Sequence, residues 1–93
     1  MLFRSRIQKI DGDILVKLVE QGIVPAGTRL YDRMRLVVAV VVADGTIKVG
    51  DLQGSIHKVG SVVTNTPSCN GWTFWHLERG SELVAIDVLR TGR

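Results

Sequence analysis

Residues 70–76 read Asn-Gly-Trp-Thr-Phe-Trp-His, and this stretch holds both tryptophans, one of the two phenylalanines and one of the two histidines. Asn70-Gly71 is typical of a turn. The residues after it suit a strand, on which successive side chains point to opposite faces. Trp72 and Trp75 then lie on opposite faces, so one indole can be core while the other is surface. We expect Trp72, next to the turn, to be the exposed ring.

Upstream of this stretch, the clearest structural signal is a β-hairpin. Residues 36–43 (Leu-Val-Val-Ala-Val-Val-Val-Ala) precede Asp44-Gly45, and residues 46–49 follow. Asp-Gly supplies the positive φ angles of a type I′ turn. The first strand is apolar on both faces, so it is either central and covered twice, or one face meets another protein surface. A further strand is expected to start within residues 28–31.

Apolar spacing predicts one helix before this hairpin and one after it. The first is capped by Asp11 or Asp13, turns residues 14, 15, 18 and 19 inward, and ends at Gly22. The second is capped by Ser55, with residues 56, 59, 62 and 63 inward and residues 57, 58, 60 and 61 outward. Gly60 in its interior costs about 1 kcal/mol relative to alanine, which indicates close packing there. Residues 50–54 form a turn, and residues 83–89 form a last short helix or turn with Ile86 and Leu89 inward.

Length, charge and cysteine count narrow the class of protein. A chain of 93 residues forms one domain, with residues 1–9 as an arm or linker. The lone Cys69 cannot form an intramolecular disulfide, and no Cys/His spacing suits zinc, so no metal or cofactor is expected and a reducing cytoplasm is the simplest compartment. The valine run over 37–42 is far shorter than the about 20 apolar residues that span a bilayer. We predict a small α+β domain, with an antiparallel sheet around the hairpin packed against two or three short helices.

The formal net charge of +3 permits a phosphate-bearing partner without requiring one. Ser55, Lys58 and the first amides of their helix can hold phosphate, or can be a structural cap with a solvated lysine. Arg33 and Arg35 can meet phosphate, or be solvated loop charges. Asn70 can form hydrogen bonds with a base edge, or it can be a turn residue that tolerates the left-handed backbone conformation.

Catalysis has no comparable support. His57 and His76 have no carboxylate or nucleophile at a spacing that would complete a catalytic site, and Cys69 has no activating partner.

Three motifs resemble one family. Residues 54–60 (Gly-Ser-Ile-His-Lys-Val-Gly), 68–76 (Ser-Cys-Asn-Gly-Trp-Thr-Phe-Trp-His) and 86–90 (Ile-Asp-Val-Leu-Arg) occur in this order. They resemble the C-terminal domain of the β-class, cell-cycle-regulated DNA adenine-N6 methyltransferases, within the restriction enzyme adenine methylase associated (RAMA) group. The similarity extends more loosely to residues 22–27 and 43–45, so it covers residues 10–93 as one RAMA-like domain.

The resemblance implies a bacterial, nucleoid-associated DNA-binding module attached to a methyltransferase that modifies adenine in GANTC sites. Such a module binds duplex DNA and locally opened single strands. Family positions tied to DNA contact match Ser55, Asn70 and Trp72, and we add His57, Lys58, Arg33 and Arg35 as neighbouring candidates. In this role Ser55 holds a phosphate, and Asn70 and Trp72 bind unpaired bases.

Two departures from the family pattern limit what this chain can do. It lacks the Asp-Pro-Pro-Tyr run and the glycine-rich S-adenosylmethionine loop, so it is not an enzyme by itself. Residues 36–43 are also more apolar than the corresponding family strand. The alternative function is therefore a protein-interaction module or homodimer that uses the valine-rich strand.

Overall fold

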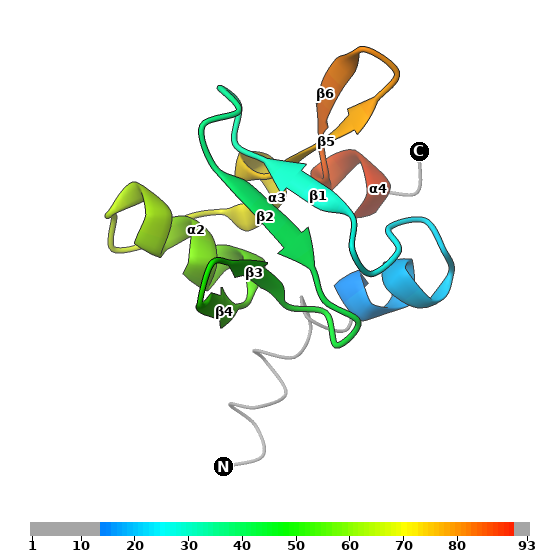
Figure 1. Ribbon diagram of the computed structural model, residues 1–93, viewed down its shortest axis with the longest axis horizontal. Helices are drawn as coiled ribbons and strands as arrows, with labels where there is room; N and C mark the ends of the chain where they lie inside the picture. The colour runs from blue at the N-terminus through cyan, green and yellow to red at the C-terminus, as the bar shows by residue number, and fades with distance from the viewer. Residues whose placement is uncertain (1–13, 91–93) are drawn as a thin grey trace.

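The computed structural model describes residues 14–90, and these form one antiparallel sheet with short helices packed against it (Figure 1). The sheet has six strands in the order β4-β3-β2-β1-β5-β6. Its strands are β1 (Arg29–Tyr31), β2 (Val38–Val41), β3 (Ile47–Val49), β4 (Leu52–Gly54), β5 (His76–Arg79) and β6 (Glu82–Ala85). The helices are residues 14–20, α2 (Ile56–Thr64), α3 (Gly71–Phe74) and α4 (Asp87–Arg90). The predicted α+β class is confirmed.

The central strands have one buried face and one exposed face. Leu30 of β1 pairs with Ala39 of β2, and Val41 of β2 pairs with Ile47 of β3, and all four side chains are buried. The alternate residues of β2 point the other way, and Val38 and Val40 are 43% and 40% exposed. Of the two alternatives for this strand, double coverage is wrong for the described part of the chain, because the outer face of β2 stays accessible.

The helices over residues 14–20 and in α2 are confirmed, with corrections to α2. Leu15 and Leu18 are buried, as predicted, and Gly22 ends their helix with a φ of 77°. In α2, however, Val62 is 49% exposed and Gly60 is buried. A Cβ at Gly60 would lie 2.6 Å from Cys69 Sγ, so the face that carries this glycine is turned toward the 65–70 segment. The arm expected over 1–9 and the caps at Asp11 and Asp13 lie outside the described residues.

The prediction of a strand starting at Trp72 is wrong. Asn70 Oδ1 accepts a hydrogen bond from the Trp72 amide at 3.1 Å, which starts the helical turn α3, and strand β5 begins only at His76. A helical turn places residues three apart on the same side. Trp72 and Trp75 are therefore both in the core, at 1% and 0% exposure, instead of on opposite faces.

Three smaller predictions also need correction. The sequence predicts a turn over residues 50–54, but residues 52–54 form strand β4. It predicts a helix or turn over residues 83–89, but residues 83–85 belong to strand β6. Ile86 and Leu89 are buried, as predicted. At the β2–β3 turn only Gly45 has positive φ, and the Asp44 carboxylate accepts hydrogen bonds from the Thr46 amide and hydroxyl. The turn is therefore not type I′, which needs positive φ at both central residues.

No helix within residues 14–90 has the length and apolar character needed to cross a lipid bilayer.

Candidate nucleic-acid interface

The N-terminus of α2 carries a cation where most helices favour an anion. Ser55 is the N-cap, with its hydroxyl oxygen accepting from the Lys58 amide at 3.0 Å. The first turn contains no acidic residue, and the exposed Lys58 side chain lies in it. Since the N-terminal end of a helix carries a partial positive charge, Lys58 adds to that charge instead of compensating it. This end of α2 is suited to an anionic ligand.

Two hydrogen bonds fasten α3 to the start of α2. The Gly71 amide donates to His57 Nδ1 at 2.9 Å, and the Trp75 indole donates to the Ile56 carbonyl at 3.0 Å. A Cβ at Gly71 would lie 2.6 Å from the Ile56 carbonyl carbon, so only glycine allows this approach. His57, predicted to contact DNA, thus uses one ring nitrogen to hold the two helices together. The same contact brings Asn70 close to the Ser55 end of α2.

Trp72 does not have the exposed position predicted for it. Its ring is 1% exposed, and the Arg90 guanidinium of α4 lies 5.0 Å from the ring centroid. A ring enclosed in this way cannot stack on a base while the fold is intact. The two groups predicted beside it, the Ser55 hydroxyl and the Asn70 amide, remain on exposed residues.

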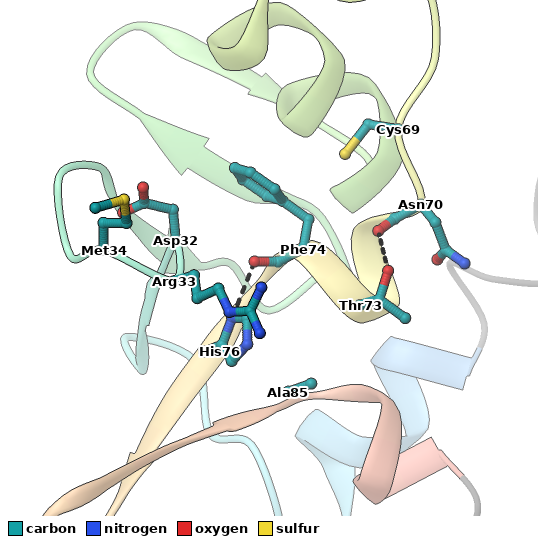
Figure 2. A pocket seen from close by; sticks show the side chains of 9 residues that line it. All are labelled: Asp32, Arg33, Met34, Cys69, Asn70, Thr73, Phe74, His76 and Ala85. Carbon is teal, nitrogen blue, oxygen red and sulfur yellow. Dashed lines mark hydrogen bonds between the residues drawn. The ribbon is translucent and has the colours of Figure 1, made fainter.

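The described residues also form an open groove of about 810 Å³ between the β1–β2 loop, the 69–74 segment and the β5–β6 hairpin. Figure 2 shows the Phe74 ring between Cys69 on one side and Asp32 with Met34 on the other, while the Asn70 carboxamide points away from Phe74. The lining residues are Asp32, Arg33, Met34, Cys69, Asn70, Thr73, Phe74, His76 and Ala85. The partly buried aromatic ring next to the predicted contact residues is therefore Phe74, not Trp72.

Arg33 and Arg35, which the sequence treats alike, have different surroundings. Arg35 pairs with Glu78 of β5, and its guanidinium lies 5.4 Å from the Tyr31 ring centroid. Arg33 lines the groove, is exposed, and forms no ion pair or hydrogen bond with any residue of the 14–90 range. Of these two arginines, only Arg33 has a charge that is available to a ligand without breaking an ion pair within residues 14–90.

Sequence reasoning missed Phe74, Thr73 and His76 as groove residues. A strand over 72–77 would have put Phe74 and His76 on one face and Thr73 on the other. The helical turn and the following strand bring all three to the same groove. No local pattern signals this, because the groove is completed by the β1–β2 loop about 40 residues earlier.

The Cys69 thiol is not activated as a nucleophile, and the described residues contain no cluster of metal ligands. Burial raises the pKa of the Cys69 thiol, which keeps it protonated at neutral pH. Within residues 14–90, no three His, Cys, Asp or Glu side chains gather as metal ligands.

Residues 5–91 match the family described as Restriction Enzyme Adenine Methylase Associated, or RAMA. The chain belongs to the RAMA family. This membership confirms the resemblance at the level of the RAMA group.

One characterised relative of this RAMA chain is the Type II methyltransferase M.HinfI of Haemophilus influenzae. The two are 30% identical over 73 residues, which are 78% of this chain and 20% of that methyltransferase. The RAMA chain spans about a fifth of the length of this relative.

Proposed function

We propose that this RAMA chain is a non-catalytic DNA-binding module of, or related to, a GANTC-type DNA adenine-N6 methyltransferase of the cell-cycle-regulated class. In this role it binds the duplex, contacts backbone phosphates and assists strand opening for a catalytic domain in a bacterial, nucleoid-associated enzyme. Membership in a methylase-associated family and the similarity to M.HinfI support this proposal. The C-terminal position of such a module is part of the proposal.

The single observation that carries the DNA-binding role is the acid-free first turn of α2. An exposed lysine near a helix N-terminus is unfavourable by about 0.3–1 kcal/mol unless an anion compensates it. A backbone phosphate supplies that anion, and we propose that it contacts the Ser55 hydroxyl at the N-cap and the exposed Lys58 in the first turn. Asn70 contributes a neighbouring amide, because the Gly71–His57 hydrogen bond draws its loop to the same end of α2.

A salt-dependent binding titration tests this function. Fluorescence anisotropy with a duplex containing one GANTC site should give binding whose affinity falls with salt, with a slope of about 0.9 per phosphate contacted. Lys58→Gln should reduce that slope by about one, whereas Lys17→Gln, on the helix over residues 14–20, should leave it unchanged. Binding that is absent at micromolar protein in low salt would contradict the proposal.

A second candidate function rests on the exposed apolar side chains of β2 and of the loop that precedes it. Met34, Leu36, Val38 and Val40 are 73%, 79%, 43% and 40% exposed. Neighbouring exposed apolar side chains are typical of protein contact sites. In this alternative the chain is a protein-interaction module or homodimer through β2. Light scattering tests it: a dimer that Val40→Lys converts to a monomer, with no salt-dependent DNA binding, would favour this function.

A further inference from the structure

We infer that the groove lined by Arg33, Phe74 and His76 receives a single unpaired nucleotide of bound DNA, with the base against Phe74 and a phosphate at Arg33. The inference rests on the proposed DNA-binding function and names a site for the opened strand. In this inference the base stacks on Phe74, which lines the groove, and not on the buried Trp72.

The groove has the size and the wall that a base requires. Its volume of about 810 Å³ lies within the range of roughly 300–1,000 Å³ that is typical of small-ligand sites. Phe74 is only partly buried, and the Trp75 ring meets it edge-on at a centroid distance of 4.8 Å and an interplanar angle of 86°. This contact fixes the Phe74 ring. Any base can stack on such a ring, because every base has a π-face.

Polar groups suited to a nucleotide surround this wall. Arg33 brings a guanidinium without a partner among residues 14–90, and guanidinium groups bind phosphate through paired N–H donors. His76 Nδ1 lies 3.0 Å from the Phe74 carbonyl oxygen. A carbonyl only accepts, so Nδ1 carries the hydrogen and Nε2 of the neutral ring is an acceptor for a base edge.

The loop beside the groove explains why the nucleotide would come from an opened duplex. Met34 lines the groove, and Met34 and Leu36 are the two most exposed large apolar side chains in the described chain, at 73% and 79%. Arg33 and Arg35 alternate with them along the loop. Methionine and leucine side chains of DNA-binding proteins insert between base steps and unstack them. An apolar side chain inserted in this way fills the space of a displaced base while the groove holds that base.

A pair of matched duplexes tests the inference with the full 93-residue chain. One is fully paired, and the other carries a single bulged adenine at its centre. Anisotropy titrations should show that the wild-type chain binds the bulged duplex about tenfold more tightly, within the range expected for one stacked base. Phe74→Leu should remove most of this preference. Arg33→Gln should weaken bulged-duplex binding several-fold. Arg33 is exposed and has no ion pair or hydrogen bond within residues 14–90, so we expect this variant to fold normally.

Arg79→Gln is the matched control, because it removes the same charge from an exposed position of β5 that does not line the groove. It should keep the tenfold preference for the bulged duplex. Equal binding of both duplexes by the wild-type chain would overturn the inference and leave the DNA-binding function intact. Weakening of bulged-duplex binding by Arg79→Gln equal to that by Arg33→Gln would also overturn it. Binding to neither duplex would overturn the inference and the proposed function together.

Discussion

Lys58→Glu should stabilise the fold while weakening DNA binding. Lys58 lies in the first turn of α2, which contains no acidic residue. At an exposed N-terminal turn, a cation is unfavourable and an anion favourable by about 0.3–1 kcal/mol each at low salt. Reversing the charge therefore raises the free energy of unfolding by roughly 0.6–2 kcal/mol. Because Lys58 is exposed, we expect a value in the lower half of this range. The proposed phosphate contact becomes a repulsion.

Thermal unfolding at low salt measures the first effect. A gain of 1 kcal/mol raises the Tm of a domain of this size by about 4–8 °C. The control is Lys48→Glu, since Lys48 is exposed on strand β3, where there is no helix macrodipole. It should leave the Tm nearly unchanged. A Tm for Lys58→Glu at or below that of the wild type would refute the electrostatic argument for α2.

The DNA titration measures the second effect and separates the two parts of the reasoning. A more stable Lys58→Glu variant that binds duplex DNA with the wild-type salt slope would mean that the helix argument is right and the phosphate contact is wrong. A more stable variant with a slope reduced by about one or more would support both.

Four further predictions concern the packing around α3 and the turn between β2 and β3. Trp72→Ala should lower the free energy of unfolding by about 3–5 kcal/mol in urea denaturation, because the buried ring leaves a cavity; a loss of DNA binding with the stability unchanged would contradict its core role. Gly71→Ala should lower the free energy of unfolding by at least about 1–3 kcal/mol, because its Cβ would overlap the backbone of α2. A Tm equal to that of the wild type would contradict the close contact between Gly71 and Ile56. His57→Ala should lower stability by about 1–3 kcal/mol by leaving the Gly71 amide without its acceptor, so unchanged amide hydrogen exchange at that position would count against it. Hydrogen bonds from Thr46 lower the pKa of the Asp44 carboxyl, so its stabilising contribution is present at neutral pH and lost as pH falls through that lowered pKa; Thr46→Val should raise the pKa in an NMR titration.

The RAMA motifs and three local features of the fold follow from neighbouring residues in the sequence. The β2–β3 hairpin, the Ser55 cap and the end of the first helix at Gly22 each depend on contacts within a few residues, and all three are correct. The turn type at Asp44 is wrong even so, because a side-chain hydrogen bond to Thr46 competes with the backbone geometry that Asp-Gly favours.

The tertiary structure alone decides which side chains remain accessible. Whether Trp72 is inside depends on a single helical turn over 71–74, which is too short for apolar spacing to distinguish from a strand. Arg33 and Arg35 differ because Glu78, 43 residues after Arg35, pairs with Arg35, whereas Arg33 lines the groove. Local spacing in the sequence determines the helices over 14–20 and in α2 and the β2–β3 hairpin, because their hydrogen bonds join near neighbours. Which ring is accessible (Phe74) and which charge is available (Arg33) depend on residues far apart in the chain, and only the folded sheet brings these residues together.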